Sequence, residues 1–368
     1  MSFYSIYKKY KNIDLNKLFE SRPKDIKKVL MQDNMSFDDF SFLLSVEAEE
    51  YLEDMAQKAH RITLQNFGKT IQLYTPIYLS SYCDNKCVYC GFKKDNLIKR
   101  RKLSLEEVEK EASFIAATGL AHILVLVGDS REHSPVSYIK ECVKVLGKYF
   151  ASISIEIYAL TENEYRQLID AGVDGLTIYQ EVYDEQIYDE LHFSGPKKDY
   201  IFRLDAPERG AKAGMRTINI GVLLGLNDFR TEAFFLGLHA KYLQDKYTDT
   251  EISISVPRIR SYAGSFEAKH SLSDKNLVQM IMAIRLFLPR VGVTVSTREN
   301  ERLRENLLPF GVTKISAGTT TAVGGHTLDD KEKSSLQFDL LDKRSVADIT
   351  EMLRRKGYQP VFKDWMKV

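Results

Sequence analysis

The feature that most constrains the fold of this chain is a regular alternation of apolar, β-branched runs with amphipathic helical stretches. Eight runs have the character of strands: Gln72–Leu79, His122–Val127, Ser152–Ile157, Gly175–Gln180, Thr217–Leu223, Glu251–Val256, Gly292–Ser296 and Thr313–Ser316. The helical stretches are Ser104–Thr118, Pro135–Tyr149, Thr161–Ala171, Asp184–Leu191, Asp199–Ala213, Thr231–Asp245, Ser273–Leu288 and Asn300–Leu307. Because each return connection carries a helix, the strands should lie parallel. Eight such units point to a (β/α)8 barrel with its site at the carboxyl ends of the strands, and an open doubly wound sheet is the alternative.

Two extensions flank the predicted barrel, which should occupy residues 71–318. Residues 1–70 read as helices that precede it, with a helix start at Ser36–Asp39. After the barrel come the Gly/Thr-rich loop GTTTAVGG, a helix near Ser345–Lys356 and the closing GYQPVFKDW. We expect residues 319–368 to form a C-terminal extension that packs on the barrel.

The composition excludes several classes of partner. Lys and Arg (52) nearly balance Asp and Glu (51), so no large field exists to attract nucleic acid. The N-terminal stretch is polar and does not resemble a signal peptide. The longest apolar run falls far short of the ~20 residues that a membrane helix needs. We therefore expect a soluble, cytoplasmic protein with no membrane or nucleic-acid partner.

Three of the four cysteines stand in one short stretch, YCDNKCVYCGF, directly after the first predicted strand. At spacings of four and three, the thiolates of Cys83, Cys87 and Cys90 can ligate three irons of one 4Fe–4S cubane. No fourth cysteine is in the loop, so one iron would keep an open position, as a reactive centre requires. A structural zinc site of three Cys plus a distant His is the alternative, although no second CxxC pair exists. Cys142, on an amphipathic helix, reads as a core residue.

The cysteine pattern is that of the radical S-adenosylmethionine (SAM) superfamily, and further motifs narrow the resemblance. These are PIYLSSYCDNKCVYCGF from Pro76, YQEVY at Tyr179–Tyr183, HFSGPKKDYIFRLDAPERGAKAG at His192–Gly214, STRE at Ser296–Glu299, ISAGT at Ile315–Thr319 and QPVFKDW at Gln359–Trp365. Together they resemble the tyrosine lyases of thiamine biosynthesis, the 2-iminoacetate synthase (ThiH) family. The resemblance runs from about residue 30 to the end of the sequence, and it favours the closed barrel over the open sheet.

The resemblance implies a radical reaction. SAM would chelate the open iron, and a 5′-deoxyadenosyl radical would take a hydrogen atom from the amino group of L-tyrosine. The Cα–Cβ bond would then break, giving p-cresol and 2-iminoacetate (dehydroglycine), which thiazole synthase consumes. A flavodoxin or ferredoxin would supply the electron. The protein itself must position the reacting atoms and exclude water and oxygen.

The resemblance also implies a set of SAM-binding residues near the ends of strands one to four. They are Tyr89 beside the adenine, Gly128 and Asp129 for the SAM amino group, Glu156, Gln180, Glu181, and Arg203 for the SAM carboxylate. Each has an ordinary alternative role, namely packing for Tyr89, solvated strand ends for the acids and a helix surface for Arg203. Asp129 stands where the family has the longer Glu.

For the amino-acid substrate, the resemblance implies Tyr78, Arg298 and Ser316, at the ends of the first, seventh and eighth predicted strands. A guanidinium fork suits a free α-carboxylate, so Arg298 is the predicted anchor. Arg258 and Arg260 in VPRIR are competing candidates.

Three other functions compete with tyrosine cleavage. A maturase that cleaves tyrosine to make CO and cyanide for the iron hydrogenase carries cysteines for a second cluster, and no cysteine follows Cys142 here. A lyase of another aromatic amino acid, such as tryptophan, differs only in pocket shape, which the sequence does not reveal. An iron–sulfur electron carrier would need a fully ligated cluster and a much shorter chain.

Overall fold

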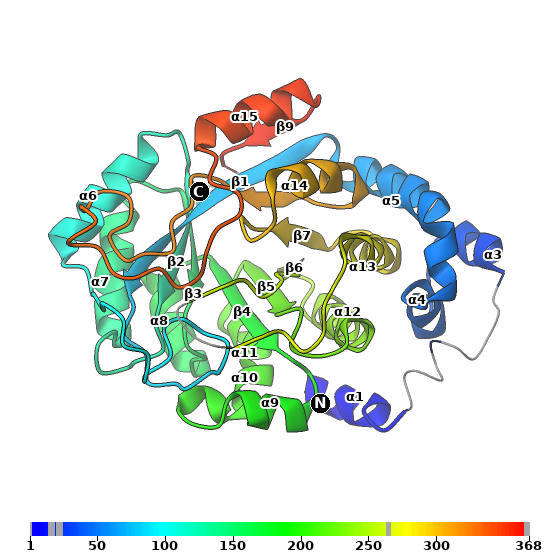
Figure 1. Cartoon of the computed structure of the whole chain (residues 1–368), viewed down its shortest axis with the longest axis horizontal. Helices are drawn as coiled ribbons and strands as arrows, with labels where there is room; N and C mark the ends of the chain where they lie inside the picture. The colour runs from blue at the N-terminus through cyan, green and yellow to red at the C-terminus, as the bar shows by residue number, and fades with distance from the viewer. Residues whose placement is uncertain (1, 14–18, 20–24, 263–265, 364–368) are drawn as a thin grey trace.

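The computed structural model describes residues 2–13, 19, 25–262 and 266–363, and within this part the strands form a closed parallel ring (Figure 1). The sheet runs in the order β2-β3-β4-β5-β6-β7-β8-β1, and β1 pairs with β2 to close it. The strands are β1 (Thr70–Ser80), β2 (His122–Val127), β3 (Ser152–Glu156), β4 (Gly175–Glu181), β5 (Thr217–Val222), β6 (Glu251–Ser255), β7 (Gly292–Val295) and β8 (Lys314–Ser316). The predicted (β/α)8 barrel is therefore confirmed, and the open sheet is excluded.

Helices cover the outside of this ring. They are α6 (Leu105–Ala116), α7 (Val136–Leu146), α8 (Glu162–Ala171), α9 (Glu185–Leu191), α10 (Tyr200–Leu204), α11 (Ala206–Ala213), α12 (Phe229–Lys246), α13 (Asp274–Phe287) and α14 (Glu301–Leu307). Thr161 and Glu164 form a capping box at the start of α8, where the predicted stretch Thr161–Ala171 begins. The single helix predicted over Asp199–Ala213 is wrong, because α10 ends before Asp205 and α11 starts afresh. Pro207 in the first turn of α11 has no N–H to continue the earlier helix.

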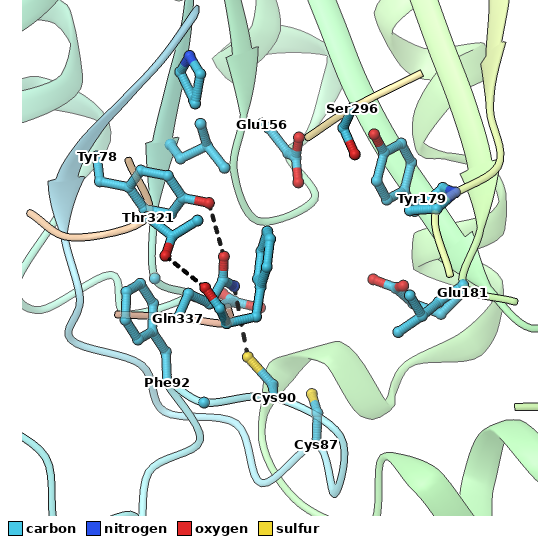
Figure 2. A pocket seen from close by; sticks show the side chains of 18 of the residues that line it. Tyr78, Cys87, Cys90, Phe92, Glu156, Tyr179, Glu181, Ser296, Thr321 and Gln337 are labelled. Carbon is cyan, nitrogen blue, oxygen red and sulfur yellow. Dashed lines mark hydrogen bonds between the residues drawn. The ribbon is translucent and has the colours of Figure 1, made fainter. Parts of the chain in front are cut away.

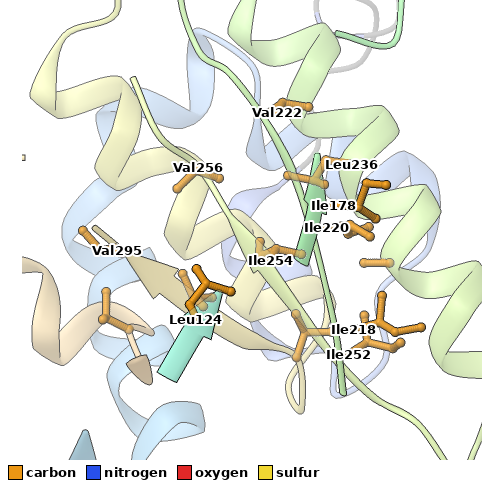
Figure 3. Packing of buried hydrophobic residues seen from close by; sticks show 14 of the residues in the cluster. Leu124, Ile178, Ile218, Ile220, Val222, Leu236, Ile252, Ile254, Val256 and Val295 are labelled. Atoms are coloured by element: carbon orange, nitrogen blue, oxygen red, sulfur yellow. The ribbon is translucent and has the colours of Figure 1, made fainter. Parts of the chain in front are cut away.

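Alternation along the strands separates an apolar layer from a polar interior. Ile218, Ile220 and Ile254 are buried, and Figure 3 shows them packed with Leu236 of α12. The residues between these isoleucines point the other way, into the barrel. There Asn219 donates a hydrogen bond to Ser255 Oγ (2.8 Å) and accepts one from Ser253 Oγ (3.2 Å). The outer layer thus holds the fold together, while the interior is polar below the site.

The N-terminal extension packs against the helices that precede and follow β6. It contains α1 (Phe3–Tyr10), α3 (Ile26–Met31), α4 (Phe37–Leu43), the 3₁₀ helix η1 (Glu47–Tyr51) and α5 (Leu52–Phe67). The helix start predicted at Ser36–Asp39 is confirmed, and Ser36 and Asp39 form a capping box there, at the start of α4. The ring of Phe40 stacks on Phe287 with centroids 4.4 Å apart. No helix in the described part of the chain is both long and apolar enough to cross a bilayer.

The C-terminal residues return to the first strand. After α15 (Val346–Arg355), strand β9 (Gln359–Val361) pairs in parallel with Thr70–Gln72 of β1. Since β2 joins β1 only from Thr75 onward, β9 occupies the edge of β1 before β2 begins. The sequence did not predict this strand. Asp364 and Trp365, the last residues of the QPVFKDW motif, lie outside the described residues.

Candidate active site

A cavity opens at the carboxyl ends of the barrel strands, where a (β/α)8 enzyme places its chemistry. Every strand or the loop after it contributes lining residues, among them Tyr78, Leu126, Glu156, Tyr179, Leu223, Pro257, Ser296 and Ser316. The segment after β8 adds Thr319, Thr321, Gln337 and Phe338. Figure 2 shows Glu156, Tyr179 and Ser296 on one side of the open space and Cys87 and Cys90 on the other.

The three cysteines predicted as iron ligands line this cavity together. Their loop is tied down by backbone hydrogen bonds, from Asp84 N to Asp129 O (2.8 Å) and from Lys86 N to Ser194 O (3.0 Å). Cys87 is buried, and Cys83 and Cys90 are half-buried. The fourth cysteine, Cys142, is buried on α7 and does not line the cavity.

The donor set fits a 4Fe–4S cluster with one open iron. Burial, together with the nearby thiol of Cys90, raises the pKa of Cys83 to about 12, so bound metal is needed to hold it as thiolate. Among the described residues, no three His, Cys, Asp or Glu side chains are arranged to share a single metal ion. A cubane needs no such set, because three of its irons each take one cysteine sulfur. The arrangement therefore suits a cluster better than the alternative zinc site.

Tyr89, which precedes the last cysteine, is held by His192. The ring of His192 donates from Nδ1 to the carbonyl of Tyr188 (2.8 Å), so its Nε2 accepts from the Tyr89 hydroxyl (2.5 Å). Burial, followed by the charge of Lys197, lowers the pKa of His192 to about 2 and keeps the imidazole neutral. The histidine of the HFSGPK motif thus orients Tyr89 beside the cysteine loop.

Gly128 and Asp129 form the turn after β2. A Cβ on Gly128 would stand 2.2 Å from the carbonyl oxygen of Tyr82, so only glycine fits against the cysteine loop. The Asp129 carboxylate accepts a hydrogen bond from Asn85 Nδ2 (2.5 Å), and Asn85 Oδ1 accepts one from Lys197 N (2.9 Å). Burial raises the pKa of Asp129. The turn therefore presents a carboxylate to the cavity, close to the iron ligands.

At the end of β4, Glu181 faces two cations. Its carboxylate lies 2.5 Å from Lys197 Nζ and 3.9 Å from the Arg203 guanidinium, whose Nε donates to Tyr179 O (2.8 Å). The backbone of Glu181 is left-handed, with φ of 72°, a strained conformation that often marks functional sites. Sequence reasoning found Glu181 and Arg203 but missed Lys197, although it stands in the HFSGPKKDY motif.

The predicted SAM contact of Gln180 is not supported by its position. Tyr179 and Glu181 line the cavity, whereas Gln180 between them does not. Alternation along the strand gives Tyr179 and Glu181 the face toward the cavity and turns Gln180 to the opposite face. The bulge between Tyr179 and Glu181 shifts only the pairing of β4 with β5. The Gln180 amide is instead buried, with no hydrogen-bond partner among the described residues.

Glu156 ends β3 with its carboxylate toward the open space (Figure 2). Burial, followed by the charge of Glu181, raises its pKa to about 7, and Arg298, Arg203 and Lys197 oppose the rise only in part. A carboxyl group whose pKa lies near 7 ionises readily when a cationic ligand binds beside it.

The structure separates the three arginines that competed as substrate anchor. Arg258 is engaged by Glu299, by Asp274 and by the carbonyl of Leu272, and it does not line the cavity. Arg260 reaches the cavity but donates to Glu299 (2.8 Å) and to Arg298 O.

Of these three arginines, Arg298 has N–H donors that no described residue uses. Its guanidinium stacks 3.4 Å from the centroid of Phe338 and makes one long hydrogen bond, 3.5 Å, to Arg258 O. Burial lowers its pKa without removing its charge.

Tyr78 and Ser316 complete the predicted substrate side. Ser316 Oγ accepts a hydrogen bond from Thr297 N (3.1 Å), and its hydroxyl also lies within hydrogen-bond reach of the Tyr74 side chain. Tyr78 donates from its hydroxyl to Gln337 Oε1 (2.9 Å), and Gln337 Nε2 reaches Cys90 Sγ (3.6 Å), as Figure 2 shows. The sequence missed Tyr179, Ser296, Gln337 and Phe338. STRE and YQEVY contained the first two, whereas nothing in the polar loop before residue 338 indicated that it reaches the site.

Comparison with known proteins shows which family this chain belongs to. Residues 77–236 match the Radical SAM superfamily, and residues 255–359 match the Biotin and Thiamin Synthesis associated domain. The barrel, the three-cysteine loop and these matches define a radical SAM enzyme, which uses a 4Fe–4S cluster and SAM. The 2-iminoacetate synthases of Salmonella typhimurium and Escherichia coli are each 36% identical over 93% of this chain and 90% of their own length. The chain belongs to the 2-iminoacetate synthase family.

A solved structure gives the same picture of the fold. The FeFe-hydrogenase maturase HydG from Carboxydothermus hydrogenoformans superposes with a TM-score of 0.90 at 31% identity. The alignment covers 98% of this chain and 84% of the maturase.

Proposed function

We propose that this chain is a radical SAM lyase that cleaves the Cα–Cβ bond of L-tyrosine into 2-iminoacetate and p-cresol for thiamine thiazole synthesis. Membership of the 2-iminoacetate synthase family supports the reaction. The observation that carries it is one cavity in which the cysteine loop faces Arg298, an arginine with unused donors. Such a cavity offers room for a cluster-bound nucleotide and an amino acid side by side.

Cys83, Cys87 and Cys90 would hold the cluster, and the polar groups around them would hold SAM. When bound, the cluster and SAM supply a 5′-deoxyadenosyl radical that removes a hydrogen atom from the substrate. Tyr89 would support the adenine, and Gly128 and Asp129 would face the amino group. Arg203 and Lys197, which Glu181 holds side by side, would offer positive charge to the carboxylate. Glu156 presents a carboxylate toward the same space.

On the substrate side, Arg298 would anchor the α-carboxylate through its fork of N–H donors, assisted by the Ser316 hydroxyl. The Phe338 ring beneath the guanidinium fixes its orientation, so the direction from which it meets the carboxylate is fixed as well. Tyr78 completes this side. A displacement of about 1 Å can cost ~10²-fold in rate, so this anchor decides which hydrogen atom faces the radical.

The experiment is an anaerobic assay of the reconstituted protein with SAM and tyrosine. Arg298→Lys keeps the charge but loses the fork, so it should give 5′-deoxyadenosine with little p-cresol. Arg258→Lys, which changes an arginine outside the cavity, should keep the wild-type ratio of the two products. If Arg298→Lys makes as much p-cresol per 5′-deoxyadenosine as wild type does, Arg298 is not the substrate anchor. Wild type that cleaves tryptophan and leaves tyrosine intact would replace the substrate with the alternative aromatic amino acid.

Partners and boundaries belong to the same proposal. We infer that thiazole synthase consumes the 2-iminoacetate and that a flavodoxin or ferredoxin donates the electron, in the cytoplasm. The short lifetime expected of a free imine supports the first partner, and the need for one electron per SAM supports the second. The barrel limits of 71–318, with extensions at 1–70 and 319–368, remain the proposed division of the chain.

A further inference from the structure

Gln337 lies between the cysteine loop and the substrate side of the cavity, although it comes from neither. Its Nε2 is 3.6 Å from Cys90 Sγ, and its Oε1 accepts a hydrogen bond of 2.9 Å from the Tyr78 hydroxyl. One amide thus joins a predicted iron ligand to a predicted substrate contact (Figure 2).

The backbone around Gln337 holds this amide in place. Gly91 lies so close that a Cβ there would stand 2.2 Å from Gln337 O. Gln337 N donates to Thr321 O (3.2 Å), and Thr321 Oγ1 donates to Phe338 O (2.9 Å). Two residues earlier, Ser335 Oγ accepts from Lys99 N (3.1 Å) on the segment that follows the cysteine loop. The backbone from which the Gln337 side chain extends is therefore held on both sides, and the amide itself is held by its contacts with Tyr78 and Cys90.

The chemistry of the thiolate fixes which way the amide points. A thiolate bound to iron can only accept a hydrogen bond, so the amide NH₂ must face Cys90 and the amide oxygen must face Tyr78. The Tyr78 hydroxyl then has to donate its single proton to Gln337. Only its lone pairs remain for the cavity, and a ligand group that meets them has to be a donor.

We propose that Gln337 is a positioning residue that sets the hydrogen-bond polarity of Tyr78 and tunes the cluster through Cys90. The hydrogen-bond polarity assigns Tyr78 to the amino group of the amino acid. This assignment rests on the proposed function for the identity of the substrate. The sequence had grouped Tyr78 with Arg298 on the carboxylate. The amine is thereby held on the side of the cavity that faces the cysteine loop. The N–H donated to Cys90 Sγ stabilises the added charge of the reduced cluster and raises its reduction potential.

The first test measures the cluster without any substrate. In an EPR-monitored redox titration of the reconstituted protein, Gln337→Leu should shift the midpoint potential to a more negative value at unchanged iron content. Tyr78→Phe keeps the N–H donor and should leave the potential at the wild-type value. Leu336→Ala changes an exposed neighbour on the same segment and should also leave it unmoved. An unshifted potential in Gln337→Leu overturns the contact with Cys90.

The second test measures binding with SAM present. The probes are L-tyrosine and 3-(4-hydroxyphenyl)propanoate, which keeps the carboxylate and lacks the amine. Wild type should favour tyrosine, and Tyr78→Phe should reduce this preference about tenfold, the loss of one hydrogen bond. Gln337→Leu should reduce it similarly, because the freed hydroxyl can donate to either ligand. The double variant should lose no more than Tyr78→Phe alone, which a merely structural role would not produce. An unchanged preference in both single variants overturns the assignment of Tyr78.

Failure of the proposed function is distinguishable from failure of this inference. If wild type binds tryptophan in place of tyrosine, the substrate is wrong. The same comparison is then made with tryptophan and indole-3-propanoate, and the redox test is unaffected.

Discussion

The charged side chains at the mouth of the barrel are matched to zwitterionic ligands. Glu156, Glu181 and Asp129 contribute carboxylates, while Arg203 and Arg298 contribute guanidinium groups, all lining one cavity. SAM and an amino acid each carry an ammonium and a carboxylate, so both signs are needed within a short distance. Placed away from bulk water, these charges attract strongly and leave little freedom in how a ligand can lie.

Replacing Cys83, Cys87 or Cys90 with Ala should abolish the cluster, because three thiolates are the whole protein ligand set. Wild type should hold about four irons per chain after anaerobic reconstitution, in one cluster. Cys142→Ala is the matched control, since this thiol is buried on α7 away from the cavity. Iron content and the visible absorbance of the cluster measure the outcome. Stoichiometric zinc with no iron in wild type would contradict the assignment.

Glu156 should make stability depend on pH around neutrality. Its pKa in the folded protein is about 7, raised by burial, and the unfolded value is the ordinary, lower one. The folded state therefore binds more protons between the two values, and stability falls as pH rises through this interval. Glu156→Gln cannot ionise. Its thermal midpoint should exceed that of wild type above pH ~8 and converge with it toward pH ~5. A difference that does not vary with pH would show that the carboxyl titrates normally.

Regular elements were predictable from sequence, and the parts that bridge them were not. All eight barrel strands were found because β-branched runs and intervening caps carry local signals, as at Thr161 and Glu164. Strand β9 was missed because a strand of three residues with a proline at its centre shows no periodicity. Gln180 was assigned to the site from its motif, whereas alternation along β4 turns it away from the face that Tyr179 and Glu181 share. The segment around Gln337 has no pattern of its own, since tertiary contacts define its path.

Gly91→Ala should displace that segment while leaving the barrel intact. The new Cβ would stand 2.2 Å from the backbone carbonyl oxygen of Gln337, so one of the two segments must move. Gly147→Ala is the control, because its Cβ would meet nothing closer than 3.4 Å. Limited proteolysis should cut residues 319–338 faster in the Gly91 variant than in the control or wild type. Equal cleavage rates would mean that the close approach is relieved without loosening the segment.

At the scale of the whole molecule, the C-terminal extension is tied to the barrel by a buried ion pair as well as by β9. Arg304 on α14 contacts Asp342 and the carbonyl of Ser316, and both charged side chains are almost fully buried. Arg344 adds a second contact to Asp342 at 2.7 Å. These contacts join the extension to the end of β8, beside the substrate side of the cavity.

Asp342→Ala should cost about 3–5 kcal/mol, because it leaves the Arg304 charge buried and unpaired. Glu141→Ala removes an exposed pair with Lys144 on α7 and should cost less than about 1 kcal/mol. The fall in thermal midpoint compares the two. If the thermal midpoint falls equally little in both variants, the Arg304 charge is solvated by water once Asp342 is removed.

The pairing of β9 with the start of β1 has a consequence for the order of events during synthesis. The cysteine loop leaves the ribosome soon after β1, whereas the residues that cover it and the strand that completes the edge of β1 emerge near the end. Contacts between such distant parts of a chain form late, since a long loop must close first. We therefore expect the nascent chain to expose its thiols to the medium for most of translation. Iron and sulfide can then reach the three thiols before the C-terminal residues cover them.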